Sequence, residues 1–139
     1  ILQWYFSGVG FRVEEFVPRE VAIDDSERWR LGFGGLGDDL VLGDRIGDSA
    51  GRIRLWCGPL DRDAFARFLP DGADFPIVAA LARLLLRSPL EVVLVLTLRP
   101  EAMAAAELGA DAFHLGHNTW LGLPDPDRTP WPSFFLPGT

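Results

Sequence analysis

The segment from Gly51 to Gly72 reads GRIRLWCGPLDRDAFARFLPDG, and its hydrophobic period changes in the middle. Over 52–57 apolar residues alternate with polar or amphipathic ones, which is the period of a half-buried strand. Gly58-Pro59 is expected to end that strand. Apolar residues then recur at helical spacing, and Asp61 precedes them as a candidate N-cap. The segment therefore predicts a strand, a turn and a helix that ends at 70–72.

Other stretches predict further elements: a helix end over 1–6, a strand over 11–17, a capped helical turn over 24–28, a short strand over 40–42, a turn over 46–51, a helix over 75–87 and a strand over 90–98. The strand over 90–98 is nearly all apolar, as expected for a central strand buried on both faces. Together these elements predict an α+β fold, with a small mixed or antiparallel sheet packed against two or three helices.

The helix over 75–87 is predicted to bury a wide apolar face made of Ile77, Val78, Leu81, Leu84 and Leu85. Leu81 lies in the middle of that face and is expected in the core. On this basis Leu81→Ala should destabilise the fold by about 2–5 kcal/mol.

Charge, cysteine content and the length of apolar runs limit the partners and the compartment expected for this chain. The 139 residues include 13 basic and 20 acidic ones, a formal net charge of −7. Such a chain repels phosphate, so nucleic acid and anionic membrane surfaces are poor partners. The single Cys57 cannot form a disulfide framework and fits a reducing compartment. The longest apolar run, Leu90 to Leu98, contains Glu91 and is too short to span a bilayer, so no direct membrane insertion is expected.

Motifs that suggest catalysis have simpler interpretations. Residues 32–37 match G-x-G-x-x-G, but Asp38 and Asp39 follow and would repel a pyrophosphate, which favours a turn. His114 and His117 could bind zinc with Asp111, but zinc takes three or four ligands, and structural or interface histidines are favoured. We therefore predict no metal, no cofactor and no catalysis, with a small metal-dependent hydrolase built on these residues as the alternative.

The aromatic residues suggest protein contacts. Trp56 lies on the outward side of its strand with two arginines, where it stacks on an arginine or meets a second layer. The Pro-rich tail, 123–139, is expected to lack regular secondary structure and to run over the surface, either docked on a partner or packed on its own domain. The docking hypothesis predicts that deleting 123–139 weakens assembly and leaves the fold nearly as stable. The interface candidates are Trp56, Trp120, Leu121, Trp131, Phe134 and Phe135.

Four blocks in order resemble the C-terminal region of TssG, a baseplate subunit of the type VI secretion system. They are Val13–Val17, similar to V-x-V-E-x-F-V; Leu40–Ile46, similar to A-V-L-G-x-R-V; the Gly51–Gly72 segment; and Leu115–Leu121, similar to L-G-W-x-T-W-L. His117 stands where the family usually has Trp, and residues 123–139 do not align. The resemblance implies a TssG-like domain over 1–122, as a fragment of a longer chain, followed by the tail.

The resemblance also implies a function and partners. A TssG-like subunit would join two copies of TssF in a baseplate wedge and contact TssK and a TssE-like subunit. It would be a structural, cytoplasmic protein assembled at the inner-membrane face of the secretion apparatus. The alternatives are the small hydrolase above and an unrelated scaffold or adaptor domain.

Overall fold

A computed structural model describes residues 1–24, 44–86, 89–102 and 131–137. The elements are α1 (Leu2–Tyr5), β1 (Phe11–Glu14), β2 (Arg19–Ala22), β3 (Arg45–Asp48), β4 (Arg52–Leu60), α2 (Arg62–Phe68), α3 (Phe75–Leu85), β5 (Glu91–Leu98), a 3₁₀ turn η1 (Pro100–Ala102) and β6 (Ser133–Phe135). The predicted helical turn over 24–28 lies almost entirely outside the described residues. The glycine-rich motif and the strand over 40–42 lie wholly outside them.

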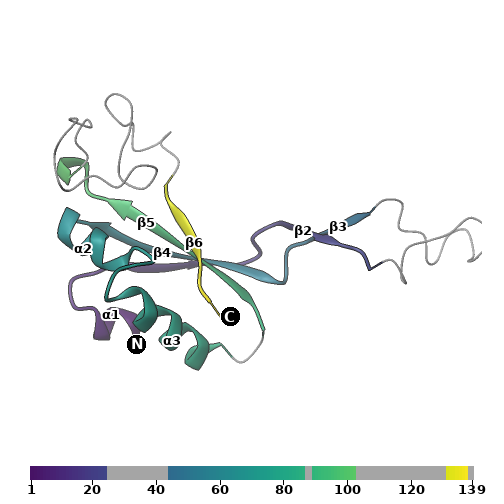
Figure 1. The fold of residues 1–139 in the computed structure, drawn as a ribbon, viewed down its shortest axis with the longest axis horizontal. Helices are drawn as coiled ribbons and strands as arrows, with labels where there is room; N and C mark the ends of the chain where they lie inside the picture. The colour runs from purple at the N-terminus through teal and green to yellow at the C-terminus, as the bar shows by residue number, and fades with distance from the viewer. Residues whose placement is uncertain (25–43, 87–88, 103–130, 138–139) are drawn as a thin grey trace, which may run out of the picture.

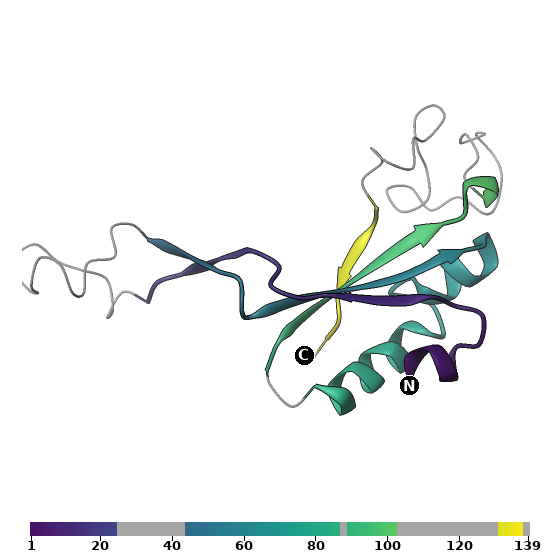
Figure 2. The same ribbon diagram turned by 180° about the vertical axis from the view of Figure 1, so that it is seen from behind.

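The main sheet is mixed, which confirms the predicted α+β fold. Its strand order is β1-β4-β5-β6. The central pair, β4 and β5, is parallel, and each outer strand is antiparallel to its neighbour. Parallel neighbours need a crossover, and α2 and α3 supply it between β4 and β5. Figures 1 and 2 show the helices on one side of the sheet.

The core lies between the helices and one face of the sheet. Leu55 and Cys57 of β4 stand opposite Leu94 and Leu96 of β5, and all four are buried. The helices contribute Phe65 and Phe68 from α2, and Phe75, Val78, Ala79 and Ala82 from α3. The predicted central strand over 90–98 is confirmed as β5, which lies between β4 and β6.

Helix α3 buries a narrower sector than its sequence predicted. Its packed side consists of Phe75, Val78, Ala79 and Ala82, and the two alanines let the helix lie close to the core. Leu84 is 78% exposed and Leu85 is 43% exposed, so their assignment to the core was wrong. Leu81 is half-buried at the edge of the core, and its truncation should cost less than predicted. The sheet covers only part of a helix surface that is apolar around most of its circumference.

Strand β4 continues through Gly58-Pro59, which was predicted to end it. The pairing with β5 shifts register between Cys57 and Leu60, and Gly58 has a φ of +135°. A side chain at Gly58 would overlap Thr97, so glycine accommodates the irregularity. The helix start was predicted correctly, because Asp61 Oδ1 accepts the Ala64 N–H at 2.8 Å.

A second, two-stranded antiparallel sheet, which we call the ribbon, consists of β2 and β3. No element was predicted over 19–22. The turn predicted over 46–51 is shorter than expected, because Arg45–Asp48 forms β3 and only residues 49–51 bend into β4. The strand predicted over 11–17 ends at Glu14, since Phe16 takes a left-handed φ of +59° and turns the chain. The ribbon projects from one end of the main sheet, away from the helices (Figures 1 and 2).

The C-terminal segment also differs from its prediction. Ser133–Phe135 forms β6 at the edge of the main sheet, although Pro132 and Pro137 flank it. An edge strand tolerates prolines because its outer side needs no hydrogen-bond partner. Leu136 is buried, and its N–H donates to Val92 O at 2.9 Å. This part of the tail therefore packs on its own domain.

The buried thiol gives a chemical test of the core. Desolvation raises the pKa of Cys57 to about 12, and the negative charge of Asp74 adds to the effect. In the native protein the thiolate should therefore be scarce and Cys57 should react very slowly with iodoacetamide at pH 8. In urea the same residue should react at the rate of a free thiol, whose pKa is about 8.5. Equal rates in both states would contradict burial of Cys57.

Candidate interaction surface

The face of the main sheet opposite the helices, which we call the open face, carries charged and aromatic side chains. Its members alternate along the strands with the core residues, as the pleat requires. On β1 and β4 they are Arg12, Glu14, Arg52, Arg54 and Trp56, and on β5 and β6 they include Glu91, Val93 and Phe135, together with Val95, which is buried.

Trp56 is held in place by three neighbours on this face. Its Nε1–H donates to Glu14 Oε2 at 2.7 Å. The guanidinium carbons of Arg12 and Arg54 lie 4.9 Å and 5.8 Å from the indole centroid. Arg54 Nη1 also donates to both Glu14 oxygens, at 2.9 Å and 3.0 Å. Of the two alternatives stated for Trp56, the structure shows stacking with arginine, and the arrangement presents a preordered aromatic–arginine surface.

Glu14 gives this surface a pH dependence. The hydrogen bond from Trp56, together with Arg54, holds the pKa of Glu14 below its ordinary value of 4.5. Its ionised form therefore stabilises the fold above pH 4.5, and that contribution is lost as the pH falls through the lowered pKa. Glu14→Gln should lose less stability than the wild type between pH 7 and pH 3, measured by urea unfolding. Glu15→Gln, at an exposed neighbouring position, is the matched control; a wild-type-like loss in Glu14→Gln would contradict the contact.

Phe135 stands on the same open face, towards the other edge of the sheet. Its side chain is 63% exposed, and the Arg52 guanidinium lies 5.4 Å from its ring centroid. Trp131 and Phe134 are half-buried and pack against the core, and Phe134 makes an edge-on contact with Phe75 at 6.4 Å. Trp56 and Phe135 thus share a face, while Trp131 and Phe134 belong to the core side. Trp120 and Leu121 lie outside the described residues.

Large apolar side chains are also exposed on the helices, which the sequence analysis did not predict. Trp4 of α1 is 83% exposed, and Leu84 and Leu85 of α3 are exposed as described above. Ile77 of α3 and Tyr5 of α1 line the same cleft, together with residues of α2. The sequence did contain a signal for this exposed surface, because residues 75–86 are apolar nearly throughout. A helix that is apolar all round is usually buried on more than one side.

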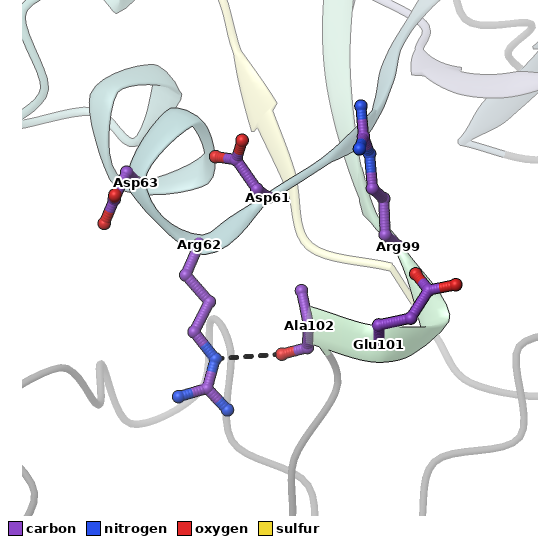
Figure 3. Close-up of a pocket in the computed structure, with 6 residues that line it drawn as sticks. All are labelled: Asp61, Arg62, Asp63, Arg99, Glu101 and Ala102. Atoms are coloured by element: carbon purple, nitrogen blue, oxygen red, sulfur yellow. Dashed lines mark hydrogen bonds between the residues drawn. The ribbon is translucent and has the colours of Figure 1, made fainter.

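A hollow at the start of α2 is lined by polar side chains that serve the local structure (Figure 3). Asp61 caps α2, and Arg62 Nε donates to Ala102 O at 3.0 Å. The carboxylates of Asp61 and Asp63 point in different directions (Figure 3). In the part of the chain that the structure describes, no group of three or more His, Cys, Asp or Glu could hold a metal ion. The histidine cluster with Asp111 lies outside those residues.

Comparison with known families decides the relationship. The family model described as "Type VI secretion, TssG" matches residues 1–122. The chain belongs to the TssG family. This confirms the resemblance found in the four sequence blocks. A comparison with curated proteins finds no match.

Two solved structures share the fold of this TssG-family chain. One is a chain of the type VI secretion system TssK-TssF-TssG baseplate subcomplex, with 21% identity and a TM-score of 0.66, covering 97% of this chain and 57% of that chain. The other comes from the baseplate complex of the type VI secretion system, with 22% identity and a TM-score of 0.57, covering 96% of this chain and 38% of that chain. The present chain therefore spans just over half of the first of these chains and just over a third of the second. Within the described residues, none of the helices is long and apolar enough to cross a membrane.

Proposed function

We propose that this chain is a structural, non-enzymatic subunit of a type VI secretion baseplate. The observation that carries the proposal is the TssG family match over residues 1–122. TssF and TssK are the proposed partners, because one structure with the same fold comes from a TssK-TssF-TssG subcomplex. Contact with a TssE-like subunit, and assembly in the cytoplasm at the inner-membrane face, are further parts of the same proposal.

The exposed surfaces support a role in assembly. Large apolar side chains exposed on the helices and on the open face are suited to burial against other proteins. Among the described residues the ribbon has only two strands, and a two-stranded sheet alone is marginally stable in water, which favours a partner. Its Val21 stands opposite Ile46, which is 46% exposed and available for contact.

Co-purification tests the function. The chain should be retained by separately expressed TssF and TssK from the same secretion system. If neither protein, alone or together, retains the folded chain, the proposal fails.

Two exposed substitutions identify the face that binds. Phe135→Ala probes the open face and Leu84→Ala probes the helix face, and both side chains are exposed enough to leave the fold intact. If Phe135 is an anchor of the interface, its loss should weaken binding by about 2 kcal/mol or more, roughly 30-fold. If only Leu84→Ala weakens binding, the interface lies on the helices and not on the open face.

A further inference from the structure

A compact group of ion pairs lies where the ribbon leaves the main sheet. Arg19, the first residue of β2, donates through Nε to Asp48 Oδ2 at 2.7 Å, across the ribbon. The same guanidinium reaches Glu91 Oε1 of β5 through Nη1, at 2.9 Å. Arg52 of β4 contacts the other carboxylate oxygen, Glu91 Oε2, through Nε and Nη2, both at 2.9 Å. Each oxygen of Glu91 thus serves one arginine, one from the ribbon and one from the sheet.

The backbone of the link between β3 and β4 packs closely against these side chains. Asp48 Oδ1 accepts the N–H groups of Ala50 and Gly51, at 2.8 Å and 3.3 Å, which shapes the short link between β3 and β4. A Cβ at Gly51 would overlap the Arg19 guanidinium, so glycine at this position lets the arginine lie against the chain. Gly51 O in turn accepts the Glu91 N–H at 2.9 Å. Backbone and side chains therefore bring four strands together at one point.

The four side chains are partly shielded from water, with between 21% and 40% of each exposed. Isolated exposed ion pairs contribute little, but a network with two-point arginine contacts holds a defined geometry. The group also touches the open face, because Arg52 lies over the ring of Phe135.

We propose that Arg19, Asp48, Arg52 and Glu91 form a joint that fixes the direction of the ribbon relative to the main sheet, with Glu91 as its central positioning residue. That the joint orients the ribbon does not depend on the proposed function. The further statement that a baseplate partner meets a preoriented ribbon does rest on the proposed function. Because the joint is electrostatic and partly solvated, high salt should loosen it.

Distance measurements between two spin labels test the joint. The labels are placed at Ala22→Cys on the ribbon and Arg83→Cys on α3, both exposed positions, and the buried Cys57 does not react. Double electron–electron resonance should give one narrow distance distribution in the parent protein. Glu91→Gln should broaden it, and so should raising the salt to about 1 M, where the Debye length falls to about 3 Å.

Glu20→Gln is the matched control, since it removes the Glu20–Arg45 pair, at 3.2 Å, which lies wholly within the ribbon. It should leave the distribution narrow. Arg19→Gln is a second test that keeps the Arg52–Glu91 contact and should also broaden the distribution. Distributions as narrow in folded Glu91→Gln or Arg19→Gln as in the parent would overturn the joint.

Retention by TssF and TssK distinguishes a failure of the proposed function from a failure of the joint. If the parent protein retains neither TssF nor TssK, the proposed function fails, while the distance distributions still decide the joint. If the parent is retained and the distributions broaden, Glu91→Gln should bind more weakly than Glu20→Gln. Equal retention of these two variants would overturn the role of the joint in presenting the ribbon.

Discussion

Leu94→Ala should destabilise the protein by about 2–5 kcal/mol, because Leu94 is fully buried at the centre of β5 and its truncation leaves a cavity. Its neighbours on the adjacent strands are Leu55 of β4 and Phe134 of β6, which face the same core, so several packed side chains lose contact together. Urea unfolding monitored by tryptophan fluorescence measures the loss as a lower midpoint.

Leu84→Ala is the matched control, since it makes the same chemical change on α3 at a side chain that is 78% exposed. Its effect should stay within about 0.5 kcal/mol. Leu81→Ala should fall between the two, in keeping with its half-buried position. If Leu84→Ala cost as much as Leu94→Ala, the assignment of the two sides of α3 would be wrong.

Removing residues 131–139 should lower the melting temperature and promote aggregation. The deletion takes away β6, whose residues pair with Val93, Leu94 and Val95, and it removes the buried Leu136. Loss of Leu136 alone corresponds to about 2–5 kcal/mol, and each kcal/mol shifts the melting temperature of a domain this size by about 2–8 °C. The deletion should therefore lower it by more than Leu136→Ala does.

Phe135→Ala serves as the control for this deletion, because its ring points to the open face and is mostly exposed. It should leave the melting temperature close to that of the wild type. An unchanged melting temperature after the deletion would support the original docking hypothesis for the tail, in which the segment contributes nothing to its own domain.

Local sequence patterns predicted the helices and strands that bury one side only and therefore show a clear hydrophobic period. The alternation over 52–57 and the helical spacing after Asp61 correspond to β4 and α2, because a strand half-covered by helices and a capped helix both leave a direct periodic signal. The all-apolar run of β5 likewise predicted a central strand. The four blocks that resemble TssG pointed to the family that the family model matches over residues 1–122.

Tertiary structure decided which face of a helix is buried where the sequence is compatible with more than one. Helix α3 is apolar around most of its surface, and only the position of the sheet selects Val78 over Leu84 for the core. In the same way Pro132 and Pro137 argued against a strand, yet β6 forms because it lies at an edge and β5 offers hydrogen bonds and apolar contacts.

The joint depends on contacts between residues far apart in the sequence. Arg19, Asp48, Arg52 and Glu91 carry no pattern that links them, and the pairing of β2 with β3 and of β4 with β5 brings them together. The sequence by itself determined the family and the elements with a clear local period, such as β4 and α2, because these depend on neighbours along the chain. The buried side of α3, the place of β6 and the direction of the ribbon depend on neighbours in space, which only the folded chain provides.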